Sequence, residues 1–101
     1  MGNTNYISSV VKILENPIQK VFNKNISTTQ FRVQLPQVRN NRIVSIVFWG
    51  KLSQDIIDYY KINDYIIIEG YLSIRDKKMF KNSRKLEITA LKVYPFILSP
   101  N

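Results

Sequence analysis

Apolar and polar residues alternate along several short stretches of this chain, a pattern typical of β-strands with one buried face. In the strictest case Phe31, Val33 and Leu35 share one face. Arg32 and Gln34 share the other. β-branched residues dominate the remaining stretches. Five strands are predicted, over residues 6–14, 31–35, 43–49, 65–75 and 84–94.

Proline, glycine and asparagine indicate how these strands are connected. Residues 18–22 alternate weakly and are expected to continue the first strand after a bend at Pro17. Residues 23–27 are predicted to form a loop, and residues 36–41 the connection of a long hairpin. Gly70 indicates a bend or bulge in the fourth strand, which a small barrel needs so that one strand can serve both halves of its sheet.

One helix is predicted between the third and fourth strands. Ser53 is its expected N-cap, and Asp55 places a negative charge in the first turn, where the helix dipole favours it. The helix is expected to end at about Lys61, before a turn at Asn63. Four residues are predicted to form its inward side: Leu52, Ile56, Tyr59 and Tyr60.

The order of three strands, a helix and two strands is that of an all-β protein with one helix, the five-stranded Greek-key barrel of the OB-fold. The 101 residues suffice for one such domain, residues 1–101 with a core over residues 5–96. The sequence has no apolar stretch near the roughly 20 residues that a membrane span requires, so no membrane partner is expected.

Charge and missing residue types narrow the function. Fifteen Lys and Arg against seven Asp and Glu give a net charge of +8. This favours a polyanionic partner, because neutralised phosphates release counterions, although a merely soluble basic surface has the same composition. Without Cys or His, no metal site or cofactor is expected. Asp55 and Asp58 are better explained as a solvated helix face than as a catalytic pair, so no enzyme is expected.

The composition also bears on the compartment. Ile, Asn, Lys and Tyr are abundant, and all have AT-rich codons, as expected of a plastid genome or a small bacterial genome. The N-terminus lacks a charged region followed by a long apolar run. A plastid (chloroplast stroma) is therefore the expected location, with the bacterial cytoplasm as the alternative.

Several segments together match a family pattern. They are Asn5, Asn16-Pro17, Phe31-x-Val33, Phe48-Trp49-Gly50-Lys51-Leu52, Tyr60, Ile68-Glu69-Gly70-x-Leu72-x-Ile74-Arg75 and Glu87. With them the chain resembles the bacterial and organellar single-stranded DNA-binding protein family, most closely its small plastid-encoded members. The resemblance implies DNA binding in replication, repair or recombination. Longer bacterial members end in an acidic tip that recruits partners, whereas this chain stops at Asn101, so no tail-mediated recruitment is expected.

The candidate binding residues begin with Trp49, which matches a stacking aromatic of the family; the alternative is a core tryptophan. Adjacent strand residues point to opposite faces, so either Phe48 or Trp49 should lie outside. The same alternation puts Tyr71 and Arg75 on the outer face, as a stacking ring and a phosphate contact, or as ordinary solvated residues.

Cations elsewhere are further candidates. Arg32 and Lys51 are expected to contact phosphates, with a solvated surface charge as the alternative. The densest basic segment connects the last two strands, a usual binding loop of this barrel, and includes an aromatic ring. Its candidate residues are Lys77, Lys78, Phe80, Lys81 and Arg84. Ile43 and Lys77 stand where the family often carries further tryptophans, which weakens the predicted aromatic platform.

The leading hypothesis is sequence-tolerant, non-catalytic binding of single-stranded DNA by a homo-oligomer, either a dimer or a tetramer. RNA is the alternative ligand, because contacts to its 2′-hydroxyl leave no mark in a sequence. The alternative function is that of a protein-interaction or replication-restart subunit, of primosome type, with weak or no DNA binding. Exposure of Ile43 and Val47 and the missing tail would permit it.

Overall fold

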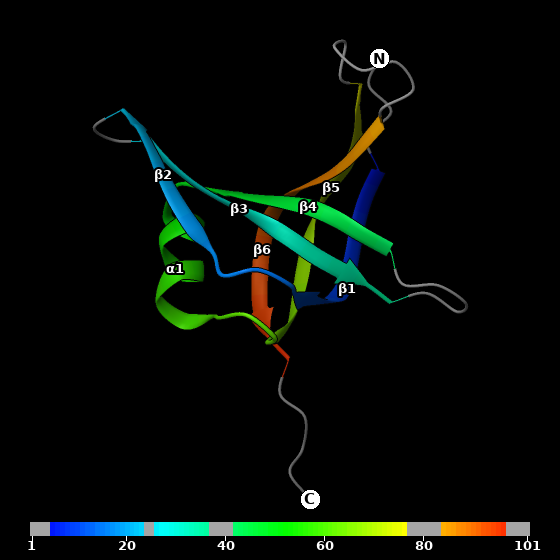
Figure 1. Cartoon of the computed structure of the whole chain (residues 1–101), viewed down its shortest axis with the longest axis horizontal. Coiled ribbons are helices and arrows are strands. Elements are labelled where there is room, and N and C mark those ends of the chain that lie inside the picture. The colour runs from blue at the N-terminus through cyan, green and yellow to red at the C-terminus, as the bar shows by residue number, and fades with distance from the viewer. Residues whose placement is uncertain (1–4, 24–25, 37–41, 77–83, 97–101) are drawn as a thin grey trace, which may run out of the picture.

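The computed structural model describes residues 5–23, 26–36, 42–76 and 84–96 (Figure 1). In chain order its elements are β1 (Asn5–Ile13), β2 (Ile18–Asn23), β3 (Ile26–Leu35), β4 (Arg42–Trp49), α1 (Lys51–Tyr59), β5 (Tyr65–Asp76) and β6 (Arg84–Pro95). The predicted β-rich architecture with a helix before the last two strands is confirmed.

Five of the strands close into a barrel. The neighbours around it are β1, β5, β6, β4 and β3, and β3 returns to β1 where Ile13 lies opposite Val33. The pairing of β4 with β6 is parallel, whereas the other recorded pairings are antiparallel. This closed barrel, with α1 between β4 and β5, is the predicted OB-fold.

The region between β1 and β4 differs in part from the prediction. β2 lies along the first half of β3, while the end of β1 pairs with its second half, so residues 18–22 do continue the first strand after a bend. The loop predicted at residues 23–27 is wrong at both ends, because β2 runs to Asn23 and β3 already begins at Ile26; residues 24–25 lie outside the described residues. Thr28 has strand partners on both sides, Lys20 and Trp49. This double pairing stabilises an extended backbone that the polar sequence does not predict by itself.

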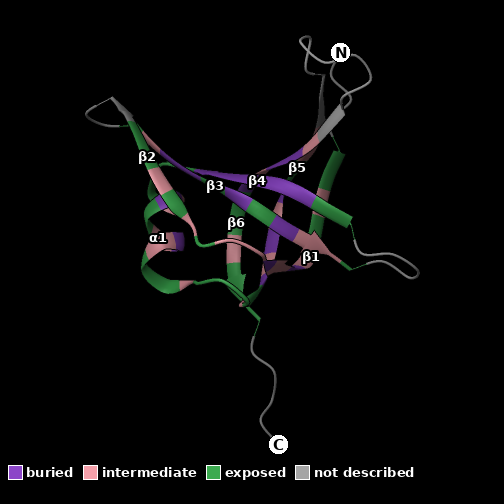
Figure 2. Cartoon of the chain, viewed as in Figure 1, coloured by how far each residue is buried: buried purple, intermediate pink, exposed green. Residues whose placement is uncertain are grey.

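The buried core cluster takes alternate residues from each of the five barrel strands, and Figure 2 shows the buried positions along them. Phe31, Val33 and Phe48 are buried as the alternation predicts, and the rings of Phe31 and Phe48 stack with centroids 5.6 Å apart. Ile56 of α1 is fully buried in the same cluster, so the helix covers one end of the barrel. Tyr59, predicted to face inward, is 75% exposed and that prediction is wrong.

The start of α1 also corrects the prediction. Gly50 is the N-cap, with a φ of 63° that disfavours other residues, and the helix begins at Lys51. Ser53 is therefore inside the helix, where its buried hydroxyl lies 2.6 Å from the Thr29 hydroxyl. Thr29 also donates to the Ser53 carbonyl oxygen, 3.0 Å away. Ser53 thus fastens α1 to β3 instead of capping it, and Asp55 falls beyond the first turn.

Gly70 lies at the predicted irregularity. The register of β5 against β6 shifts between Glu69 and Gly70, because Leu91 is an extra residue on β6. A Cβ at Gly70 would overlap the carbonyl oxygen of Thr89, so the two backbones can approach this closely only with glycine here. The predicted irregularity at Gly70 is confirmed, although the extra residue of the bulge lies on the partner strand β6.

Candidate nucleic-acid interface

The end of β4 decides which of two adjacent aromatic residues faces solvent. Phe48 is fully buried and Trp49 is 50% exposed, so the predicted alternation holds and Trp49 is not a core tryptophan. Thr28 lies directly opposite Trp49 on β3. The indole thus stands on the outside of the barrel, over the β3–β4 pair.

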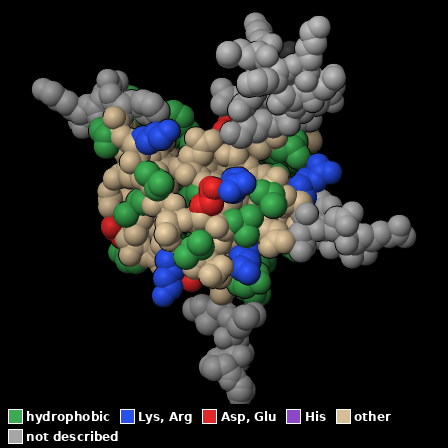
Figure 3. Space-filling model, viewed as in Figure 1, with side chains coloured by type: hydrophobic (Ala, Val, Ile, Leu, Met, Phe, Trp, Pro, Cys, Tyr) green, Lys and Arg blue, Asp and Glu red, His purple; other side chains and the backbone are tan. Residues whose placement is uncertain are grey.

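Residues on the same outer surface extend from Trp49 across three strands. The register places Gln30 opposite both Ile18 of β2 and Val47 of β4, and Arg32 opposite Ser45. We call this surface the platform, defined by Ile18, Lys20, Gln30, Arg32, Ser45 and Trp49. Figure 3 looks onto the side of the molecule where β2, β3 and β4 lie, with basic side chains scattered among hydrophobic ones.

The platform contains a hollow of about 350 Å³. Ile18 and Lys20 line it from β2, Gln30 and Arg32 from β3, and Ser45 from β4, together with Glu15 and Phe31. Ile18 is 66% exposed and offers an apolar wall. The hollow is of the size that binds small organic groups, at the lower end of the range for ligand pockets.

A polar network forms the floor beside this hollow. The side-chain amide of Gln30 donates to the Ser45 hydroxyl at 2.9 Å and to the Glu87 carboxylate at 3.2 Å. Ser45 and Glu87 are both buried and lie opposite each other on β4 and β6. A carboxylate is thus held beneath the outer surface of the barrel, partly covered by a glutamine.

Arg32 is already engaged by a carboxylate. Its backbone N–H and its Nε both donate to Glu15, each at 2.8 Å. These two hydrogen bonds, the backbone one first, hold the pKa of Glu15 below its usual value. The guanidinium remains largely exposed, so a phosphate that binds Arg32 must share it with Glu15 or replace Glu15.

A second outer surface lies on β1 and β5 and is rich in tyrosine. The Tyr6 and Tyr71 rings meet edge to face, with centroids 5.6 Å apart, and the Tyr6 hydroxyl donates to Glu69. That hydrogen bond is the main cause of a raised Tyr6 pKa. We call this surface the tyrosine face, defined by Tyr6, Val10, Lys12, Tyr65, Glu69 and Tyr71.

The chain is similar in sequence to a protein of Trieres chinensis. It is 41% identical over 102 residues to "Putative single-stranded DNA-binding protein ycf41" of Trieres chinensis, covering 93% of this chain and 90% of that protein. The chain belongs to the ycf41 family. No family model matches the sequence.

Solved structures show how the ycf41 fold relates to others. The SSB domain of a Synechococcus protein superposes with a TM-score of 0.74 at 23% identity, over 89% of this chain and 93% of that one. The small single-stranded DNA-binding protein of Streptomyces coelicolor gives 0.79 at 15% identity, over 94% and 96%. SSBb of Mycobacterium smegmatis gives 0.74 at 22% identity, over 95% and 96%. At these identities the likeness establishes the shared barrel.

The predicted binding residues are not all brought together in this ycf41-family chain. Trp49 is on the platform and Lys51 is exposed at the adjacent start of α1. Tyr71 is 42% exposed and faces outward as predicted, but on the tyrosine face. Arg75 pairs with Lys85, and Arg84 with Asp76, at the far end of β5 and β6. The predicted loop contacts Lys77, Lys78, Phe80 and Lys81 lie outside the described residues.

The two apolar positions of β4 behave differently from each other. Ile43 is 56% exposed, as expected. Val47 is buried, at 9%, and its expected exposure is wrong. The reason is its position in the middle of the sheet, where Gln30 and Thr89 flank it from the neighbouring strands.

Sequence reasoning missed four platform residues: Ile18, Lys20, Gln30 and Ser45. Residues two apart on a strand share a face, so the outward Arg32 would have placed Gln30 on the outside of β3. By the same rule, the outward Trp49 would have placed Ser45 on the outside of β4. The prediction of a loop at residues 23–27 hid this continuity. No sequence pattern identified Glu15 as a site residue, because its contact with Arg32 depends on the bend between β1 and β2.

In the ranges that the structure describes, no cluster of three His, Cys, Asp or Glu side chains is arranged to hold a metal ion. The one helix in those ranges, α1, is not long and apolar enough to cross a membrane.

Proposed function

We propose that this protein binds single-stranded DNA, without catalysing a reaction, in DNA replication, repair or recombination. The half-exposed indole of Trp49 beside the cations of the platform is the observation that carries the proposal. Stacking of a base on an exposed aromatic ring and attraction of the backbone to cations together give sequence-tolerant binding. The name of the Trieres chinensis relative supports the same ligand.

The proposed contacts divide by chemistry. Trp49 stacks a base, Lys51 and Arg32 contact phosphates, and Tyr71 and Arg75 extend the path across β5. The connection between β5 and β6 adds the predicted contacts Lys77, Lys78, Phe80 and Lys81, and the start of β6 adds Arg84. Trp49 ranks above Tyr71, because Tyr71 lies beside a carboxylate, Glu69, that repels phosphate.

A salt titration tests the proposal. If each chain contacts about four or five phosphates, log affinity should fall with log salt with a slope of about −3, at roughly −0.7 per phosphate on single strands. Fluorescent oligo(dT) titrated at several salt concentrations gives this slope. Absence of binding at low salt, or affinity independent of salt, would contradict the proposal. Competition by oligo(U) measures whether RNA binds as well.

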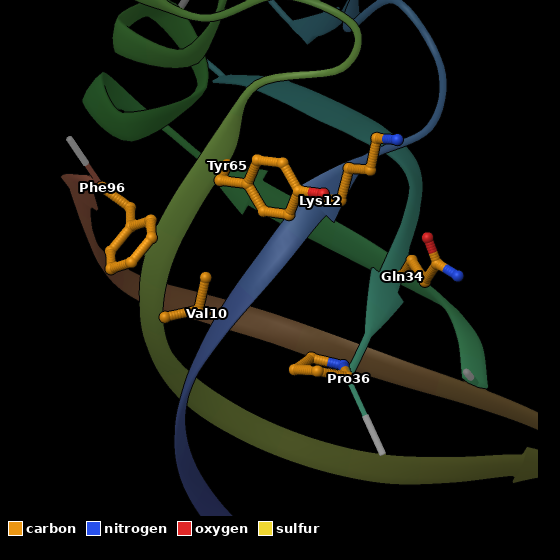
Figure 4. A pocket seen from close by; sticks show the side chains of 6 residues that line it. All are labelled: Val10, Lys12, Gln34, Pro36, Tyr65 and Phe96. Atoms are coloured by element: carbon orange, nitrogen blue, oxygen red, sulfur yellow. The ribbon is translucent and has the colours of Figure 1, made fainter. Parts of the chain in front are cut away.

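We further propose that the protein is a homo-oligomer that associates through the open edge of β1. Within the described residues, positions 5–11 of β1 pair with β5 alone, which leaves the other backbone edge open to a second strand. Beside this edge is a second hollow, of about 320 Å³, lined by Val10, Lys12, Gln34, Pro36, Tyr65 and Phe96 (Figure 4). Light scattering should give a mass of two or four chains; the mass of one chain would contradict this proposal.

The proposed location is the plastid stroma. The abundance of residues with AT-rich codons and the relationship to the ycf41 protein of Trieres chinensis support it. Immunolocalisation in the source organism would test it.

The second candidate function is a protein-interaction or replication-restart subunit with weak DNA binding. The exposed Ile43 on the outer side of β4 favours it. Purification of the native protein at low salt, with and without nuclease, distinguishes the two functions. Co-eluting protein without nucleic acid would favour the second.

A further inference from the structure

The hollow of the platform has a polar group whose orientation is fixed by its neighbours. The Nε2 atom of the Gln30 side-chain amide donates to the Glu87 carboxylate at 3.2 Å, so its NH₂ group faces Glu87. The same NH₂ also donates to Ser45. The carbonyl oxygen of the Gln30 amide is therefore directed away from Glu87. On the outer surface this side chain acts as a hydrogen-bond acceptor.

Charge decides which part of a nucleotide can enter the hollow. Glu15 lies at its rim, and Glu87 lies beneath Gln30. Lys20 and Arg32 line two sides of the hollow and attract phosphates there, which leaves the polar floor at Gln30 for a base. The exposed side chain of Ile18 offers an apolar surface for the flat face of a base. A base over the hollow, with its phosphate near Lys20, satisfies both conditions.

We propose that this hollow is a base-reading site that prefers a base with an exocyclic amino group, such as cytosine, over uracil or thymine. The amino group donates to the outward carbonyl oxygen of Gln30, whereas uracil and thymine present a carbonyl oxygen at the same ring position. Gln30 is the contact, and Glu87 is a positioning residue that fixes the amide. The inference rests on the proposed binding of single-stranded DNA and adds a base preference to it.

Oligo(dC) and oligo(dU) of equal length are the test probes, because they differ only at the ring edge and not by a methyl group. Fluorescence titration at pH 8 should show about three- to tenfold tighter binding of oligo(dC), the value of one hydrogen bond. Gln30→Leu keeps the size of the side chain and removes the acceptor, so the ratio of the affinities for oligo(dC) and oligo(dU) should fall toward one. Gln54→Leu, on the exposed surface of α1, is the matched control and should keep the preference.

Glu87→Gln is the second variant, and it tests the proposal even if Gln30→Leu does not fold. It keeps the shape of the side chain but lets the Gln30 amide turn over, so the ratio of the two affinities should fall toward one. Thermal melting checks that both variants are folded. A merely structural role for Glu87 would lower the melting temperature and leave the ratio unchanged.

Each outcome has one meaning. Tight wild-type binding of both probes with equal affinity would overturn the base-reading site and leave the proposed function standing. A preference that survives both substitutions would also overturn it. Absence of binding to any single strand would overturn the proposed function itself.

Discussion

Trp49 on the platform and Tyr71 on the tyrosine face are both outward-facing aromatic residues at strand positions, yet their surroundings differ. Trp49 stands near exposed cations and a hollow with a polar floor. Tyr71 packs against Tyr6, whose hydroxyl is bound by Glu69. The first arrangement combines an aromatic ring with cations that attract phosphate. The second places a carboxylate beside the rings of one chain. An exposed ring therefore indicates a nucleic-acid site only together with the charges around it.

Substitution of the two rings gives the largest expected effect. Trp49→Ala should weaken binding of oligo(dT) by about 1–3 kcal/mol, the value of one stacked base. Tyr71→Ala should weaken it by less. Fluorescence titration at one salt concentration measures both losses of affinity. Tyr59→Ala is the control, because the Tyr59 ring on α1 is more exposed than the Trp49 and Tyr71 rings. A loss from Tyr71→Ala as large as that from Trp49→Ala would remove the distinction between the two faces.

A charge on the tyrosine face should change the mass of the protein in solution instead. Val10 is half-buried and lines the hollow beside the open edge of β1, so Val10→Asp should oppose a second copy there. Light scattering should show a shift toward the mass of one chain. The affinity of each chain for a short oligonucleotide should change less than twofold. If the mass stays that of the wild type, the copies meet elsewhere.

The smallest expected effect concerns the ion pair on the platform. Glu15→Gln removes the carboxylate that holds Arg32, so binding of oligo(dT) should tighten about twofold and its salt slope should steepen by up to roughly 0.7. Tighter binding with an unchanged slope would argue against a phosphate contact by Arg32.

The same pair makes a small contribution to stability that depends on pH. Because the pKa of Glu15 is lowered in the folded protein, its contribution is present above the unfolded pKa and is lost as the pH falls through the folded value. The wild type should therefore melt slightly above Glu15→Gln at pH 7, and the difference should disappear in strong acid. Melting curves at both pH values measure it.

Structural features that depend on neighbouring residues along one strand could be predicted from the sequence. The outward position of Trp49 follows from its adjacency to Phe48, and the bulge follows from Gly70 within a β-branched run. Features that depend on distant partners could not be predicted in this way. Ser53 looked like a cap but forms a buried hydrogen bond to Thr29, and the polar start of β3 is a strand because it has neighbours on both sides.

The candidate site shows the same division. Trp49 could be found from its place on one strand, whereas the network of Gln30 with Glu87 joins residues far apart in the chain. The pairing of Arg32 with Glu15 requires a bend whose geometry no local pattern specifies. Tyr59 was misplaced because Leu52, Ile56 and Tyr60, spaced four residues apart, fill the inward side and leave Tyr59 exposed at the last helical position.

The parallel pairing of β4 with β6 has a consequence for how the chain folds. Ser45 lies opposite Glu87, and Val47 opposite Thr89, about forty residues later in the sequence. Contacts of such long range slow the folding of small domains, because the entropy of closing the loop is lost before the contact forms. During synthesis, the earlier hairpin and α1 leave the ribosome without the strand that closes the barrel. The nascent chain therefore exposes the unpaired edge of β4 until its last strand has been made.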